Sequence, residues 1–119
     1  MDEYKVVFYD TPNGDVPVRE FLEGLDPKMR AKMTRSIVFL RENGVQARLP
    51  YSEHLDDGIF ELRAKVGSDI SRVLYFFFVG KNIILTNGFI KKTQKTPPGE
   101  IELAKKRRKE YLSRKGDAR

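Results

Sequence analysis

The sequence predicts a single α+β domain in which a mostly antiparallel sheet packs against a helical hairpin and a basic helix follows at the C-terminus. Three observations support this prediction. Residues 58–95 contain consecutive stretches that are separated by turn residues. In each stretch apolar and polar residues alternate, or all residues are apolar, and both patterns are typical of β-strands. The segments on either side carry apolar residues three or four positions apart, as helices do. The length of 119 residues is near the common size of one domain, so residues 1–119 are assigned to one domain.

The first 44 residues predict one strand and two helices. Residues Tyr4 to Tyr9 form a short strand of aromatic and β-branched residues. Residues Val16 to Leu25 carry an apolar helical stripe, and Pro17 is tolerated only in the first turn of this helix. A second helix is expected to begin with Asp26 as its N-cap and to end at Gly44. The apolar stripes of the two helices need a sheet to cover, which predicts a helical hairpin on one sheet face.

Three strands are expected after a connection from Val45 to Leu55, which has room for a short strand near Tyr51. The three strands span Ile59–Val66, Ser71–Val79 and Ile83–Ile90, and turns that contain glycine separate them. The overall order is therefore β-α-α-β-β-β-α. The middle strand is apolar on both faces after its first residues, which is typical of a central strand.

Five cations are predicted to meet at one rim of this sheet. Alternation in the first of the three strands places Glu61, Arg63 and Lys65 on a face that we expect to be open. Antiparallel pairing brings the start of the second strand and the end of the third beside these residues. The predicted rim holds Arg63, Lys65, Arg72, Lys91 and Lys92. Like charges repel at such a rim, and a bound anion would relieve the repulsion. The alternative is a set of ordinary solvated edge charges.

The positive charge of the chain is concentrated at its C-terminal end. Residues 86–119 hold 11 of the 23 Lys and Arg residues and 4 of the 17 Asp and Glu residues. Residues 1–85 hold the other 12 basic and 13 acidic residues. A final helix is expected after Thr96, because the two prolines that follow fit in a first helical turn. This helix should fray after about residue 113. Its basic face is either a solvated surface or a flank that contacts RNA phosphates. The residues assigned to that flank are Lys95, Lys105, Lys106 and Arg108.

The composition excludes several kinds of site. The chain has no cysteine, so it can form neither disulfides nor thiolate metal sites. A single histidine without Cys or His partners does not make a metal site either. No apolar run is long enough to span a membrane, and the N-terminus lacks the pattern of a signal peptide. We therefore expect a cytoplasmic protein that uses no metal and no cofactor.

His54 is the one side chain with an ordinary pKa suited to proton transfer near neutral pH. It stands just before the basic strand, from where it could reach the predicted rim. The alternative is a loop residue without a chemical role.

The remaining inventory of basic and tyrosine side chains fits a reaction that mainly needs stabilisation of charge on phosphate. The sequence has no Gly-rich phosphate loop, no HExxH motif and no recognisable Ser/His/Asp arrangement. Cleavage of RNA by its own 2′-hydroxyl is one such reaction, because the substrate carries its own nucleophile. Arginines could neutralise the developing charge, and a lysine whose pKa is lowered by neighbouring cations could act as the base.

The C-terminal half contains a specific run of residues. The segment Phe89 to Pro97 reads FIKKTQKTP, and Glu100, Ala104, Arg107 and Tyr111 follow it. Together with the strands before it, this run resembles the phage-derived, HigB-like branch of the RelE/ParE toxin superfamily over about the last 60 residues. The RelE-like fold of that superfamily has the same β-α-α-β-β-β-α order.

The resemblance implies a type II toxin that cleaves mRNA, usually on the ribosome. It also implies a HigA-like antitoxin partner with a helix-turn-helix domain. The toxin–antitoxin complex would contact operator DNA only through this antitoxin. Among site residues, it implies that Arg72 and either Lys91 or Lys92 stabilise the scissile phosphate, and that Arg63 and Lys65 position the RNA.

The sequence specifies the residues for proton transfer and the kind of activity less closely. The candidates for base and acid are Lys65, Lys92 and His54. Some RelE relatives carry a catalytic tyrosine or histidine near the C-terminus, whereas Tyr111 here lies on the apolar stripe of the final helix and is expected to be structural. Two other interpretations stay open. One is a toxin that binds a protein target without cleaving RNA, as in the ParE branch, and the other is a phage-derived remnant that binds only its antitoxin.

Overall fold

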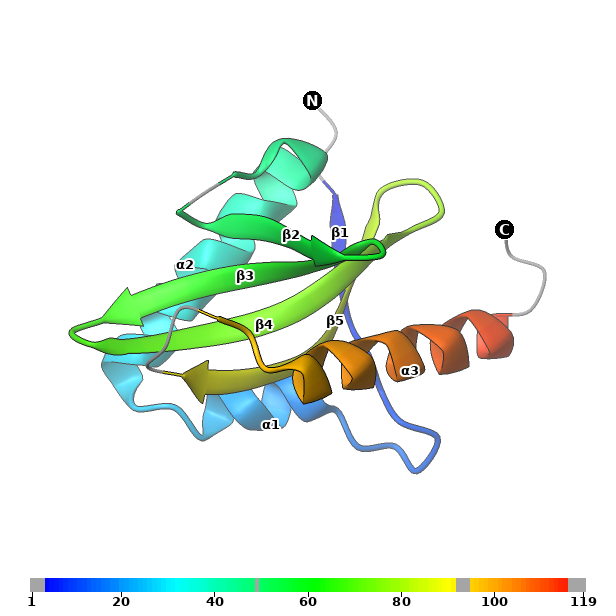
Figure 1. Cartoon of the computed structure of the whole chain (residues 1–119), viewed down its shortest axis with the longest axis horizontal. Coiled ribbons are helices and arrows are strands. Elements are labelled where there is room, and N and C mark those ends of the chain that lie inside the picture. The colour runs from blue at the N-terminus through cyan, green and yellow to red at the C-terminus, as the bar shows by residue number, and fades with distance from the viewer. Residues whose placement is uncertain (1–3, 49, 92–94, 116–119) are drawn as a thin grey trace.

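The structure, a computed structural model, describes residues 4–48, 50–91 and 95–115. Within these residues a five-stranded sheet carries helices on both sides (Figure 1). The elements are, in chain order, β1 (Lys5–Phe8), α1 (Pro17–Glu23), α2 (Pro27–Asn43), a single 3₁₀ turn (Gly44–Gln46), β2 (Ser52–Asp56), β3 (Ile59–Val66), β4 (Asp69–Phe78), β5 (Asn82–Lys91) and α3 (Pro98–Lys115).

The strands follow the order β1-β5-β4-β3-β2 across the sheet. Among the described strands β1 and β5 pair in parallel, and the other neighbouring pairs are antiparallel. The predicted α+β class and mostly antiparallel sheet are confirmed, and β4 lies in the centre as its apolar faces indicated. The short strand expected near Tyr51 is β2, which begins at Ser52 and forms one edge of the sheet.

The helical hairpin covers the first face of the sheet. The carboxylate of Asp26 accepts hydrogen bonds from the backbone N–H groups of Lys28 and Met29 at 3.0 and 3.1 Å, so Asp26 caps α2 as predicted. Buried side chains of α2 and α1 then pack on apolar residues of β3, β4 and β5. This cluster includes Val18, Met29, Met33, Leu40, Leu62, Val73 and Leu85.

Gly88 allows α1 to approach the sheet closely. A Cβ at this position would lie 2.4 Å from a ring carbon of Phe21, which is closer than unbonded carbon atoms can approach. The missing side chain therefore makes room for the Phe21 ring over β5, and this contact sets the distance between α1 and the sheet.

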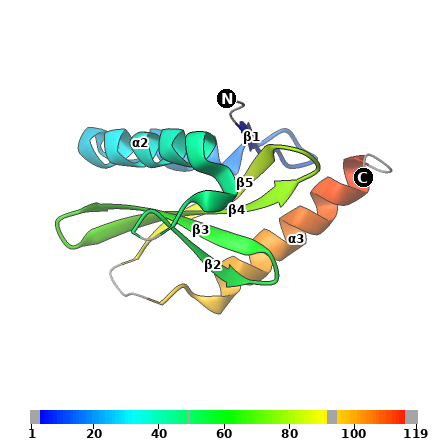
Figure 2. The same ribbon diagram turned by 90° about the horizontal axis from the view of Figure 1, so that it is seen from above.

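The second face of the sheet is covered by α3, and the expectation of an open face there was wrong. Figure 2 shows α2 and α3 on opposite sides of the sheet. Ile59, Leu74 and Phe76 point to the α3 side and are buried there against Ala104 and Tyr111. The Tyr111 ring meets Phe76 and Phe78 edge-on, with centroid distances of 5.9 and 5.3 Å. Because that face also carries large apolar residues, it too requires a cover, and Tyr111 has the predicted structural position.

The last turn of α3 is held by polar contacts with the loop after β1. Arg114 donates hydrogen bonds to the carbonyl of Asp10 at 2.6 Å and to the Glu110 carboxylate at 3.0 Å, and Glu110 also accepts one from the Tyr9 hydroxyl at 2.8 Å. The helix therefore continues to Lys115, beyond the residue at which fraying was expected. No helix in the described ranges is both long enough and apolar enough to cross a membrane.

Candidate functional site

The register of β3, β4 and β5 brings basic residues to one end of the sheet. Lys65 lies opposite Ile70, and Ile70 lies opposite Lys91, so the three side chains form a cross-strand row on the α3 side of the sheet. Lys65 and Lys91 are exposed, and their strands are two strand spacings, or about 10 Å, apart. Flexible four-carbon stems let both ammonium groups reach one phosphate between them.

Arg63 and Lys95 complete this cluster, which we call the basic end of the sheet and define as Arg63, Lys65, Lys91 and Lys95. Arg63 lies one row from Lys65 on the same face, and its side chain is 20% exposed. Lys95 is exposed at the bend that follows β5. The sequence-predicted Lys92 lies outside the described residues.

Arg72 lies on the same face but does not belong to the exposed rim. The family resemblance implied a position beside the scissile phosphate, whereas the Arg72 side chain is fully buried. Its guanidinium Nη1 donates to the Glu61 carboxylate at 3.3 Å and to the hydroxyl of Thr96 at 3.2 Å. The segment around Thr96 crosses in front of β4 on its way to α3 (Figure 1), and it covers the position that had been expected to be open.

Glu61 is the centre of this buried network. Its side chain is fully buried, and it accepts hydrogen bonds from Arg63 Nε at 2.7 Å, from Arg72 and from the Thr96 hydroxyl. Arg63 extends the network to the surface by pairing with the Glu53 carboxylate at 2.5 Å. The network thus fixes the Arg63 guanidinium and joins Thr96, the residue after Lys95, to the sheet.

This role of Glu61 was not predicted from the sequence, and Thr96 was expected only to precede the final helix. A usable signal was present in the strand alternation. Glu61 shares its face with Ile59, whose burial requires a cover over that side of β3. A carboxylate under such a cover needs cationic partners, and the arginines on the same and the neighbouring strand were available.

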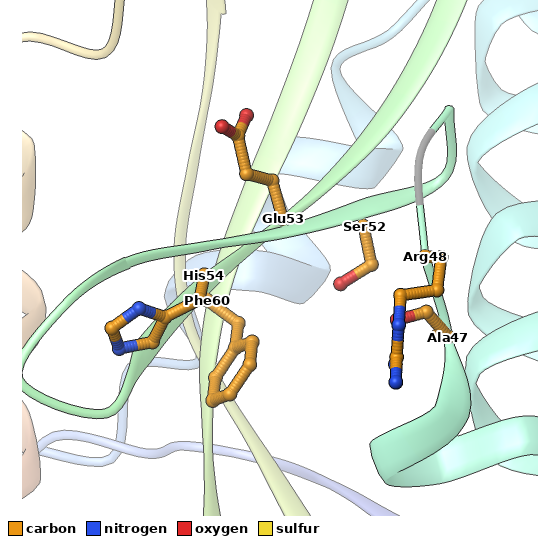
Figure 3. Close-up of a pocket in the computed structure, with 6 residues that line it drawn as sticks. All are labelled: Ala47, Arg48, Ser52, Glu53, His54 and Phe60. Carbon is orange, nitrogen blue, oxygen red and sulfur yellow. The ribbon is translucent and has the colours of Figure 1, made fainter.

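His54 does not join the basic end, contrary to the expectation that it could reach the rim. It lies opposite Phe60 in the β2–β3 pairing and therefore on the face that α2 covers. Its Nε2 accepts a hydrogen bond from the backbone N–H of Gly58 at 3.1 Å, and its ring meets Phe60 edge-on. Figure 3 shows His54 and Phe60 on one side of a pocket of about 460 Å³, with Arg48 on the other side. His54 and the row of Lys65 and Lys91 therefore lie on opposite faces of the sheet.

The comparisons with known proteins identify the family. The model of the family "Phage derived protein Gp49-like (DUF891)" matches residues 20–109, about three quarters of the chain. The chain belongs to the Gp49-like family. This family is part of the RelE/HigB-like toxins of toxin–antitoxin systems. No curated protein gave a significant match to the chain.

The part that matches the Gp49-like family includes the basic end of the sheet and the whole buried network. Membership in a toxin–antitoxin family implies that an antitoxin partner exists. Within the described ranges, no three or more His, Cys, Asp or Glu side chains are grouped so that they could hold a metal ion.

The basic face of α3 in this Gp49-like chain is largely engaged within the protein. Lys105 pairs with Asp56 at 2.6 Å and Arg108 pairs with Asp57 at 2.8 Å, because α3 lies along the turn between β2 and β3. The hydrogen bond from Lys105 lowers the pKa of the Asp56 carboxyl and raises the pKa of Lys105. Lys105 and Arg108, two of the residues predicted to contact RNA, thus hold α3 to the turn, and Lys106 is exposed.

Tyr75 makes the stability of the core on the α2 side fall at alkaline pH. Its hydroxyl forms a hydrogen bond with the Ser52 hydroxyl, and burial raises its pKa from 10.0 to about 12. The unfolded chain therefore loses this proton before the folded protein does. Stability from this group is complete below pH 10 and is lost as pH rises towards 12, by about 3 kcal/mol in total.

The expected result is that the free energy of unfolding of the wild type falls more steeply between pH 10 and 12 than that of Tyr75→Phe. Urea unfolding at several pH values would measure the difference. Tyr51→Phe is the matched control, because Tyr51 is 42% exposed. Equal pH slopes for wild type and Tyr75→Phe would contradict the prediction.

Proposed function

We propose that this protein is the toxin of a type II toxin–antitoxin system and that it cleaves mRNA at the basic end of the sheet, with the message bound on the ribosome in the cytoplasm. One observation carries the proposal. Lys65 and Lys91 project from a single cross-strand row on strands that the buried Glu61 network holds in place. A pair of exposed cations on a rigid support suits a phosphate whose charge increases during reaction.

The chemistry at this site would be transfer of the phosphodiester to the adjacent 2′-oxygen. The 2′-oxygen forms a bond to phosphorus while the bond from phosphorus to the 5′-oxygen breaks. The hydroxyl proton leaves the nucleophile, and the 5′-oxygen of the leaving strand gains a proton. The products are a 2′,3′-cyclic phosphate and a 5′-hydroxyl, and a substrate without the 2′-hydroxyl is not cut.

In this proposal the residues of the basic end have different tasks. Lys65 and Lys91 neutralise the charge that develops on the non-bridging oxygens. Arg63 orients the RNA from its fixed position between Glu53 and Glu61, and Lys95 contacts a flanking phosphate. Arg72 acts as a positioning residue, because it contacts Glu61 and Thr96 from within the protein. His54 takes no part in the chemistry.

The antitoxin partner follows from family membership, and we propose that it is HigA-like and carries a helix-turn-helix domain. In that arrangement operator DNA is contacted by the antitoxin. The antitoxin would neutralise the toxin by preventing access of mRNA to the basic end of the sheet.

The test is cleavage of mRNA in a cell-free translation reaction. We expect fragments with 5′-hydroxyl ends at fixed positions within codons, and no cut at a mapped position that carries a 2′-O-methyl group. The same message incubated without ribosomes would measure ribosome dependence. Intact mRNA in the presence of folded protein would contradict the proposal, and it would favour a toxin that binds a protein target.

A further inference from the structure

A second pocket lies beside the basic end, at the edge of β3. Among the described residues β2 pairs with β3 as far as Leu62, and the carbonyl of Tyr51 then accepts a hydrogen bond from the N–H of Arg63 at 2.8 Å. The residues of β3 that line the pocket, Arg63 to Lys65, follow this point. Its volume is about 340 Å³, within the range of small-ligand sites. Its lining includes Lys32, Ser36, Tyr51, Arg63, Lys65 and Ile70.

The charge of the pocket is positive. Its lining residues include three cationic ones, Lys32 of α2 and Arg63 and Lys65 at the edge of β3. The residues that line it include no acidic side chain. The Ser36 hydroxyl donates a hydrogen bond to the carbonyl of Arg63 at 2.9 Å and so fixes the distance between the two walls. The pocket is thus suited to an anionic ligand that has two charged contacts to make.

Tyr51 adds an aromatic surface to this basic pocket. Its side chain is 42% exposed. Its ring stacks on Phe39, with a centroid distance of 4.3 Å and an angle of 29° between the planes. The contact with Phe39 holds the Tyr51 ring in one orientation before any ligand arrives, so little conformational entropy is lost when a planar group stacks on it.

We propose that this pocket is a nucleotide subsite for the RNA segment next to the cut, and that a base stacks on Tyr51 while Lys32 and Lys65 bind phosphates. The proposal rests on the proposed function, because Arg63 and Lys65 belong to both sites and Ile70 separates Lys65 from Lys91. Positive charge combined with a stacking surface is the arrangement by which proteins hold single-stranded nucleic acid. An acidic peptide would use the charges but not the ring, so we assign the pocket to RNA.

The test uses a short oligoribonucleotide that cannot be cleaved because every 2′-position is methylated, with 2-aminopurine at one position. Stacking on Tyr51 should quench the 2-aminopurine fluorescence with the wild type and with Tyr51→Phe. Tyr51→Leu should abolish the quenching and weaken binding by roughly 5- to 100-fold. Unchanged affinity and quenching with Tyr51→Leu would overturn the proposal.

Two lysines on α2 provide a matched pair for the charged contact. Lys32 lines the pocket, whereas Lys28 lies about one helical turn away and does not. Lys32→Ala should weaken binding and reduce the salt dependence by about one phosphate contact, and Lys28→Ala should change neither. Equal effects of the two variants would overturn the assignment. The assignment to RNA would also be overturned if a glutamate-rich peptide competed with the oligonucleotide and bound to Tyr51→Leu and to the wild type with equal affinity.

Binding and cleavage report on the two proposals separately. If the wild type cleaves mRNA but Tyr51→Leu keeps the same affinity and cuts at the same positions, the subsite is wrong and the proposed function stands. If the oligonucleotide binds through Tyr51 and Lys32 but no message is cut, the subsite stands and the proposed cleavage is wrong.

Discussion

Lys65→Ala and Lys91→Ala should each lower the rate of mRNA cleavage by roughly 10²- to 10³-fold, the usual cost of removing one preorganised group that stabilises charge in the transition state. The reason is their shared row across β3, β4 and β5, which allows both ammonium groups to approach the same phosphate. Both side chains are exposed, so replacing either should leave the core and the unfolding free energy nearly unchanged. Single-turnover cleavage on programmed ribosomes would measure the effect.

Lys109→Ala is the matched control for these variants. Lys109 is an exposed lysine on α3, outside the basic end of the sheet, and its replacement changes the net charge by the same amount. If the two site lysines act on one phosphate, the double variant should lose less activity than the product of the single losses. If Lys65→Ala and Lys91→Ala cleave mRNA at the same rate as Lys109→Ala, the basic end is not the catalytic site.

Much of the fold could be predicted because it depends on local patterns. The alternation in β3 identified which residues share a face, and Asp26 as an N-cap marked the start of α2. The apolar stripe of α3 gave Tyr111 its position in the core. Each of these features is decided by residues close together in the sequence, so periodicity and capping chemistry are sufficient to find them.

The cover over the second sheet face could not be predicted in the same way. Alternation separates the two faces of a strand, but it does not say which distant segment will lie on each face. The path of α3 is set by pairs such as Lys105 with Asp56, which are 49 residues apart, and by the bond between Thr96 and Glu61. Arg72 was therefore placed on an exposed rim, although the segment around Thr96 covers it.

The candidate site was accordingly predicted in part. Lys65 and Lys91 lie together because strand register follows from short turns, which the sequence shows. His54 was misplaced because it belongs to β2, whose register and facing could not be read from one short irregular stretch. The pocket at Tyr51 depends on where β2 stops pairing with β3, and no local pattern specifies that point.

Glu61→Gln should lower the free energy of unfolding by about 3–5 kcal/mol, because it removes an anionic partner of a fully buried arginine. Arg72 would keep its charge in a position from which water is excluded. Urea unfolding would show the change as a lower midpoint with an unchanged m-value.

Glu53→Gln is the matched control, since Glu53 pairs with the same Arg63 but is 43% exposed. An exposed ion pair contributes little, so this variant should cost about 1 kcal/mol or less. Similar losses from Glu61→Gln and Glu53→Gln would show that the buried network does not stabilise the fold through its charges.

Replacing both buried partners tests what the network is for. In Glu61→Leu/Arg72→Met no buried charge is left unpaired, so most of the lost stability should return. The loss of the Glu61 carboxylate would still release Arg63 and Thr96 from their shared acceptor. If the double variant is stable but cleaves mRNA slowly, the network serves to position the basic end. Arg72→Ala by itself is a poor test of catalysis, because it disturbs the fold and the site together.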